Sequence, residues 1–188
     1  MGRLLTYYCS SCGFSLDAKE GNGFHYPNLY EKTKEKMING QMGSDAKLFF
    51  EEHPDGAINV EYTMAQCKQC NNLENVLDLT MYVPKPGYIH EIDPKQKWST
   101  AAPYYGKDYV IPYDLEKNWN QYKLFNHICD KCGGTLIVST PIKYAYTCDP
   151  KGRGVDEIIK KMRSEYYQSF KCPNCNTELQ VMEYGYWD

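Results

Sequence analysis

Hydrophobic and polar residues alternate with a period of two in several short stretches of this chain. Alternation over 58–64 and over 77–83 brackets one pair of cysteines. Shorter apolar runs at 124–128, 136–138 and 179–181 lie beside two further cysteine pairs. A period of two is typical of half-buried strands, so the pattern predicts short strands around these cysteines.

A second pattern, with a period near that of the α-helix, predicts three helices. Asn28 begins a capping box, and Gly40 is expected to end that helix. A second helix is expected from Ser44 or Asp45 to just before Pro54. The third is an amphipathic helix with apolar positions at Val155, Ile158, Ile159, Met162 and Tyr166. Short strands mixed with short helices predict an α+β fold.

The composition is that of a globular protein of one compact domain or two small ones. The chain has 188 residues, of which 42% are hydrophobic. Residues 84–121 hold five of the ten prolines together with Trp98 and Trp119, and this aromatic content predicts ordered loops rather than a flexible linker. We find no signal peptide and no apolar run long enough to span a membrane, so we expect a cytoplasmic protein.

Eight of the nine cysteines form four Cys-x-x-Cys pairs. In a reducing compartment such pairs indicate metal or redox chemistry rather than disulfides. Two pairs supply four thiolates, which is the ligand set of a tetrahedral zinc site. The predicted metal ligands are Cys9, Cys12, Cys67, Cys70, Cys129, Cys132, Cys172 and Cys175. We therefore expect two Zn²⁺ ions per chain.

Each pair is followed by a residue that tolerates positive φ. These residues are Gly13, Asn71, Gly133 and Asn176. Glycine and asparagine are the residues that enter the left-handed region at least cost. The pattern predicts a Cys-x-x-Cys knuckle, meaning a tight turn whose amides point at the thiolates, at the tip of a hairpin.

Two other chemistries use the same motif. A thioredoxin-type redox pair requires a low-pKa thiolate at a helix N-terminus, whereas here strand-like segments follow the pairs. Iron accepts four thiolates in the geometry that zinc prefers, as in rubredoxin. A rubredoxin-like electron carrier is therefore the stronger of these two alternatives.

The four pairs could share two ions in more than one way. Sharing between neighbours in sequence is the simplest arrangement: the first two cysteine pairs (Cys9, Cys12, Cys67 and Cys70) bind one ion, and the last two pairs (Cys129, Cys132, Cys172 and Cys175) bind the other. A crossed arrangement joins the first pair with the fourth and the second with the third, which would merge the halves. On the simplest pairing we predict two zinc-ribbon units with short helical insertions, at 1–83 and 122–188, connected by 84–121.

The net charge of −3 argues against strong non-specific nucleic-acid binding. Only residues 143–171 are locally basic, with 7 Lys and Arg against 4 Asp and Glu. A weak nucleic-acid-binding face there would use Lys151, Arg153, Lys160, Lys161 and Arg163. The 18 tyrosines of this acidic chain favour a protein interface instead.

Two further residues have a structural and a chemical interpretation. Cys148, the unpaired cysteine, is expected to be a small buried hydrophobe rather than a nucleophile or a substitute metal ligand. His127, two residues before Cys129, would share the face of that cysteine on a strand and could hydrogen-bond a thiolate, but a histidine in this position is more often simply exposed or packed.

The first 75 residues or so resemble a group of small bacterial zinc-ribbon proteins of unknown function. The resemblance rests on four segments: Tyr8 to Gly13, Gly21 to Tyr30, Phe50 to Gly56, and Cys67 to Cys70. It implies structural metal at Cys9, Cys12, Cys67 and Cys70, and brings no known activity.

Together these features predict a non-enzymatic protein with two structural zinc sites that binds a protein partner or a second copy of itself. A nucleic-acid-binding ribbon and an iron electron carrier are the alternatives. An enzyme site within 84–121 would require a polar-lined pocket there.

Overall fold

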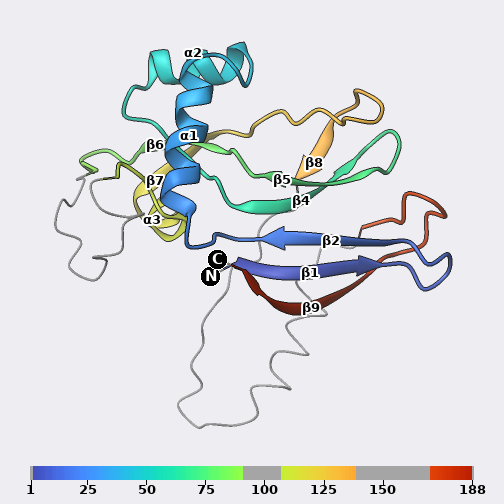
Figure 1. Ribbon diagram of the computed structural model, residues 1–188. Helices are drawn as coiled ribbons and strands as arrows, with labels where there is room; N and C mark the ends of the chain where they lie inside the picture. Colours follow the sequence, from blue (N-terminus) through green and yellow to red (C-terminus); the bar gives the residue numbers. More distant parts are fainter. Residues whose placement is uncertain (1, 91–106, 139–169, 188) are drawn as a thin grey trace, which may run out of the picture.

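Three small antiparallel sheets and three short helices make up the described part of the chain (Figure 1). The computed structural model describes residues 2–90, 107–138 and 170–187. The helices are α1 (Tyr26–Ile38), α2 (Ser44–Glu52) and α3 (Pro112–Asn118). None of the helices in these ranges has the length and apolar character needed to cross a membrane. The expected α+β class is confirmed.

The first sheet joins the two ends of the chain. Its order is β2 (Ser15–Glu20), β1 (Gly2–Tyr8) and β9 (Gln180–Trp187), with β1 in the centre. Gly2 lies opposite Trp187 and Tyr8 lies opposite Gln180, so the start of β1 and the end of β9 are side by side (Figure 1).

The second and third sheets are built in the same antiparallel way. The second has the order β5 (Leu73–Leu77), β4 (Tyr62–Cys67) and β8 (Leu136–Val138). The third has the order β3 (Ala57–Ile58), β6 (Met81–Pro84) and β7 (Trp119–Lys123). The division of the chain at 83 and 121 stays a prediction, although the first two sheets each combine strands from 1–83 and 122–188.

The alternating stretch at 77–83 forms parts of two strands rather than one. Leu79 has a φ of 60°, which is in the left-handed region and turns the chain between β5 and β6. Its N–H donates to the Asn59 carbonyl at 2.7 Å, and its side chain is buried. Tertiary packing thus holds a branched residue in a conformation that its sequence pattern did not indicate.

The strand predicted at 124–128 is wrong. The chain forms β7 just before it, and Leu124 and Ile128 are 64% and 53% exposed. Ile128 makes only an isolated bridge to Thr135. Trp119 begins the actual strand and is buried, so packing of one large ring outweighs a run of smaller apolar side chains.

Helix α1 begins before the predicted cap, and α2 lies where it was expected. Pro27 occupies the first turn of α1, where its fixed φ fits and no N–H is needed, so Asn28 lies inside the helix. Gly40, at a φ of 73°, follows the end of α1 as predicted. Helix α2 starts at Ser44 and ends before Pro54, also as predicted.

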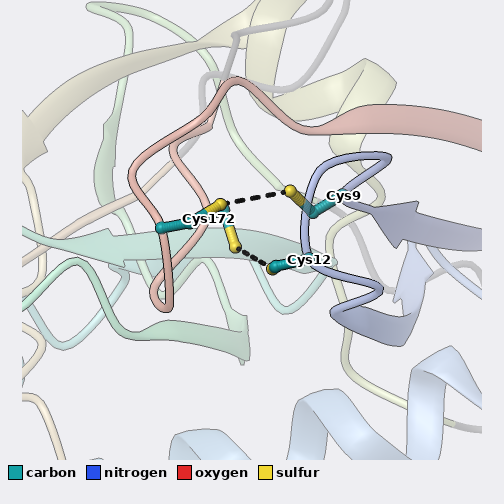
Figure 2. Close-up of side chains that lie close together, drawn as sticks. Cys9, Cys12 and Cys172 are labelled. Atoms are coloured by element: carbon teal, nitrogen blue, oxygen red, sulfur yellow. Dashed lines mark hydrogen bonds between the residues drawn. The ribbon is translucent and has the colours of Figure 1, made fainter.

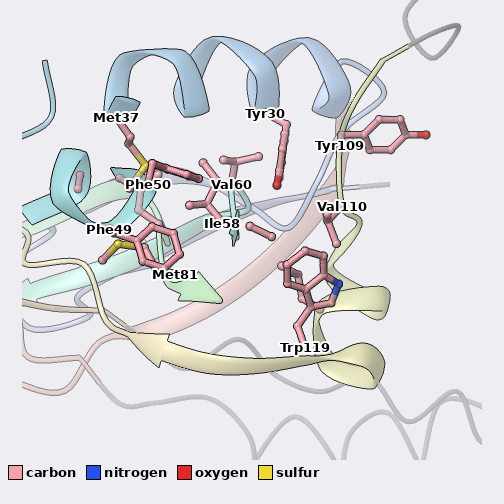
Figure 3. Close-up of a cluster of buried hydrophobic side chains, with 14 of the residues drawn as sticks. Tyr30, Met37, Phe49, Phe50, Ile58, Val60, Met81, Tyr109, Val110 and Trp119 are labelled. Atoms are coloured by element: carbon pink, nitrogen blue, oxygen red, sulfur yellow. The ribbon is translucent and has the colours of Figure 1, made fainter. Parts of the chain in front are cut away.

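The largest core lies between the two long helices and the third sheet (Figure 3). Tyr30 and Met37 project from α1 and are fully buried, while Phe49 and Phe50 project from α2. Ile58 and Met81, opposite one another in the third sheet, meet these side chains.

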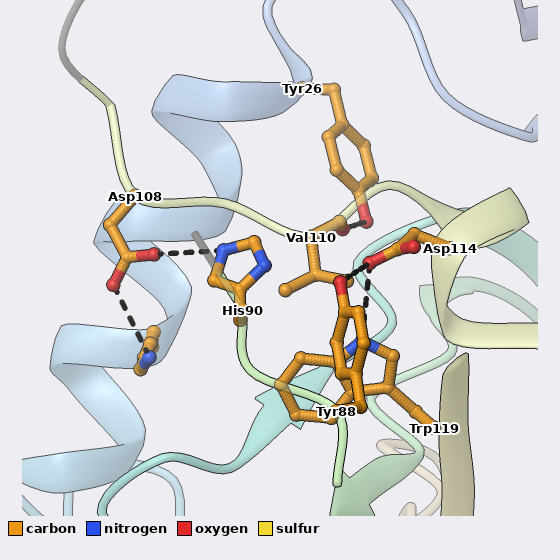
Figure 4. A network of polar contacts seen from close by, with 8 residues as sticks. Tyr26, Tyr88, His90, Asp108, Val110, Asp114 and Trp119 are labelled. Atoms are coloured by element: carbon orange, nitrogen blue, oxygen red, sulfur yellow. Dashed lines mark hydrogen bonds and ion pairs between the residues drawn. The ribbon is translucent and has the colours of Figure 1, made fainter. Parts of the chain in front are cut away.

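The described parts of 84–121 pack against this core and contain helix α3 and the start of β7 as well as loops. Val110, Leu115 and Trp119 are buried in it. The Tyr88 hydroxyl donates to the Asp114 carboxylate at 2.8 Å, and the Trp119 indole N–H donates to the same oxygen at 3.2 Å (Figure 4). Residues 91–106 lie outside the described part of the chain.

A half-buried carboxyl just before β4, that of Glu61, predicts a dependence of stability on pH. Burial is the main cause that raises the pKa of Glu61 from 4.5 to about 7, and the nearby Asp78 adds to it, while the Asn59 amide opposes the rise. Because the folded pKa exceeds the unfolded one, this group's contribution is fully present below pH 4.5 and is lost as pH rises through 7. At about 1.4 kcal/mol per pKa unit, the loss is roughly 3 kcal/mol.

We expect Glu61→Gln to remove this dependence, because glutamine cannot ionise. Urea unfolding at several pH values should show the variant more stable than the parent at pH 8 and near equal at pH 4.5. Equal pH profiles for the two proteins would contradict the assignment.

Candidate metal centres

The fold collects eight cysteines into two groups of four. The first group, called site one here, contains Cys9, Cys12, Cys172 and Cys175, and the second, site two, contains Cys67, Cys70, Cys129 and Cys132. Within each group the sulfur atoms all lie within 4.8 Å of one another. The crossed pairing is therefore the one that the fold builds, and the pairing of sequence neighbours is wrong.

Strand order explains the crossed pairing. Because β9 pairs with β1 rather than with its nearest neighbour in sequence, the last knuckle arrives beside the first. Likewise β8 pairs with β4, with Leu136 opposite Cys67, so the third knuckle arrives beside the second. Each group thus depends on contacts between segments far apart in the sequence.

All four knuckles have the same backbone structure. The residue after the second cysteine donates its N–H to the carbonyl of the first cysteine at 2.9 to 3.1 Å. The first cysteine donates its own N–H to a carbonyl five residues later at 2.7 to 2.8 Å, which closes the hairpin tip. Gly13, Asn71, Gly133 and Asn176 all have positive φ, between 57° and 73°. The left-handed position predicted in each knuckle is confirmed.

The sulfur spacing suits a tetrahedral ion. Figure 2 shows the sulfurs of Cys9, Cys12 and Cys172 turned toward one another from two separate segments. The closest distances across site one are 3.4 Å and 3.5 Å, and those across site two are 3.4 Å and 3.7 Å. Four thiolates around zinc, each about 2.3 Å from the ion, would lie about 3.8 Å apart. Both groups could therefore hold a metal ion with little rearrangement.

Each group is half buried. In site one Cys9 and Cys172 are buried, while Cys12 and Cys175 are exposed. In each of the four knuckles the first cysteine is the more buried one, because it ends a strand or bridge that packs on a core. The second cysteine of each knuckle lies at the outer edge of the group.

Backbone amides lower the pKa values of some thiols, and neighbouring thiols raise the pKa values of others. Amide N–H groups, first that of Cys70, lower the pKa of Cys67 to about 7. The Thr177 hydroxyl and its N–H lower the pKa of Cys175 to about 6. The pKa of Cys132 instead rises to about 12, because Cys70 and Cys67 outweigh the Gly134 N–H. Four adjacent thiols therefore resist full ionisation until a cation is present.

Sequence reasoning missed several polar groups that contact the sulfurs. The backbone N–H of Gln69 donates to the sulfur of Cys67, and that of Gly134 donates to the sulfur of Cys132, each at 3.4 Å. The Asn72 side chain lies 3.9 Å from the sulfur of Cys129 in the opposite knuckle. Thr177 lies 3.4 Å from the sulfur of Cys175. Gly134, Asn72 and Thr177 each stand two residues after the second cysteine of a knuckle, and this spacing was the available signal. Such contacts orient ligands and moderate their charge.

His127 does not contact a thiol. It is buried, and its Nε2 lies 3.0 Å from the Asp78 carbonyl, to which it donates. Phe125 packs against its ring. His127 is therefore a packed histidine, the outcome that the sequence favoured over a thiolate contact, and it ties the chain before site two to the turn after β5.

The remaining predicted residues cannot be placed. Lys151, Arg153, Lys160, Lys161 and Arg163 all lie outside the described residues, as do Cys148 and the helix predicted at 155–166.

A cleft of about 310 Å³ lies beside α1 and the described part of 84–121; its lining is as apolar as it is polar and includes none of the eight cysteines. The Asp108 carboxylate lies 3.4 Å from His90 and 3.7 Å from Lys34 (Figure 4). The nearby His90 is the main cause that lowers the pKa of Asp108, and Lys34 adds to it. His90 also packs against Trp119, with 5.9 Å between the ring centroids. The two cysteine groups remain the strongest candidate sites.

Comparison with protein families, with characterised proteins and with solved structures finds no match to this chain.

Proposed function

We propose that this protein binds two zinc ions in closed, structural four-cysteine sites of the zinc-ribbon type, and that the scaffold so formed binds another protein chain. The observation that carries the zinc proposal is the fourfold repetition of one knuckle geometry, assembled into two groups with tetrahedral sulfur spacing.

The ligand sets support a structural rather than a catalytic role. Catalytic zinc sites keep one position for water or substrate, whereas each group here offers four thiols and no such position. Because each site joins segments far apart in the sequence, metal binding would close long loops and supply folding free energy.

The exposed residues of β9 support a protein partner or a second copy of the chain. Met182, Tyr184 and Tyr186 alternate along β9, and each is more than half exposed. Tyrosine and methionine are enriched at protein interfaces, and the strand's one charged residue, Glu183, already pairs with Arg3. The same row carries no positive charge that would attract phosphates.

Elemental analysis of protein expressed without added metal tests the zinc proposal. We expect two zinc atoms per chain, lost one site at a time in Cys12→Ser and Cys132→Ser. Iron, with a red colour that fades on reduction, would instead indicate an electron carrier. Less than one metal ion per chain would overturn the proposal.

A further inference from the structure

The two knuckles that carry asparagine in the left-handed position face each other. The Asn71 side-chain amide donates to the Asn176 side-chain oxygen at 3.2 Å. The other two knuckles use glycine, which adopts positive φ at lower cost. The backbone alone would favour glycine at all four positions, so the side-chain contact gives asparagine a separate reason at these two.

A second contact joins the same two knuckles at their other end. The Gln66 side chain donates to the Lys171 carbonyl at 2.6 Å and accepts from the Lys171 N–H at 3.1 Å. The carboxamide thus donates to and accepts from the backbone of one residue, as a residue on a neighbouring strand would. Gln66 also donates to the Asn71 carbonyl at 3.0 Å, which links the two contacts.

The contacts connect equivalent positions of site two and site one. Gln66 directly precedes Cys67, and Lys171 directly precedes Cys172. Asn71 and Asn176 directly follow the second cysteines of the same knuckles. Both contacts span 105 residues of sequence, so the two knuckles pack with their corresponding ends together.

We propose that these contacts couple the two metal sites, so that zinc at one raises the affinity of the other. The proposal rests on the proposed function. A filled site holds its knuckle in the closed turn, and both contacts require two closed turns at once. Binding of the first ion therefore already orders part of the backbone that the second site must order when it binds its own ion. Gln66 acts here as a positioning residue, since it binds no metal itself.

The expected strength of the coupling is on the order of tenfold in affinity, within the range of coupling energies between protein sites. Three hydrogen bonds between partly exposed groups can supply that much. Each contact has one member in each knuckle, so removing either member should lower the coupling by the same factor.

Native mass spectrometry of the metal-free full chain, given one Zn²⁺ per chain, measures the coupling. The readout is the product of the empty and doubly loaded populations, divided by the square of the singly loaded population. While the ratio of the two intrinsic site affinities is unchanged, this population ratio is proportional to the coupling factor. In Gln66→Ala/Asn71→Gly we expect it to fall about tenfold, because both contacts are lost while the left-handed turn is retained.

Two further variants separate coupling from a local effect on site two. Asn176→Gly changes only the site-one knuckle and should lower the ratio as much as Asn71→Gly does. Gln121→Ala, an exposed glutamine on β7, should leave the ratio at the parent value.

Two outcomes would overturn the proposal in different ways. An unchanged ratio in Gln66→Ala/Asn71→Gly, with two zinc ions still bound, would remove the coupling and leave the proposed function standing. The absence of any zinc-loaded species in the parent protein would remove both.

Discussion

Removal of both metal ions by a strong chelator is expected to abolish the cooperative unfolding transition of this protein. Structural zinc contributes about 10 to 16 kcal/mol of binding free energy in small metal domains, whereas a domain of this size is stable by about 5 to 15 kcal/mol. Loss of both ions therefore removes more free energy than the whole free energy of unfolding of such a domain. Circular dichroism during a thermal scan, with and without chelator, measures the change.

Single-site variants divide this effect between the two sites. Cys67→Ser weakens site two at a fully buried ligand, and Cys9→Ser does the same for site one. Each should lose one zinc and unfold at a markedly lower temperature. Cys148→Ser is the matched control and should keep two zinc ions, because it lies outside the four pairs. A melting curve that neither chelation nor Cys67→Ser changes would contradict a structural role for the metal.

Truncation of Trp119 is expected to lower the free energy of unfolding by about 3 to 5 kcal/mol, the usual cost of removing a large buried aromatic ring. The indole is only 4% exposed, packs edge-on against Tyr88 at 5.8 Å between ring centroids, and donates to Asp114. Trp119→Ala would leave a cavity and remove one of the donors to that carboxylate. Urea unfolding of zinc-loaded protein measures the loss.

Two comparisons identify the source of the effect. Trp119→Phe keeps most of the packing but loses the N–H donor, and should cost about 1 to 2 kcal/mol. Tyr113→Ala, in the neighbouring helix α3, removes a side chain that is 70% exposed and should change stability by less than about 0.5 kcal/mol. Similar losses in Trp119→Ala and Tyr113→Ala would mean that Trp119 is not part of the core.

Local features of this protein followed from local sequence. The left-handed residue of each knuckle was predictable because the steric cost of positive φ depends on the residue itself, as at Gly13 and Asn71. The end of α2 was predictable because Pro54 disfavours a helical residue just before it. The start of α1 was misjudged because Pro27 competes with Asn28 for the same turn.

Contacts between distant segments followed from no local signal. Leu79 adopts positive φ because Asn59 and the core hold it there, and His127 turns to the Asp78 carbonyl because that group is brought beside it. Gln66 looks like an ordinary polar strand residue until Lys171 lies opposite its side chain. In each case the partner is tens of residues away in the sequence, beyond the reach of periodicity.

The sequence by itself determined that four knuckles would form and which eight sulfurs they would carry, because a Cys-x-x-Cys turn is closed by its own backbone. Only the tertiary structure decided which knuckles meet, because that depends on β9 pairing with β1 and β8 with β4. Strand pairing is set by the burial of side chains from the whole chain, and no single hairpin contains that information.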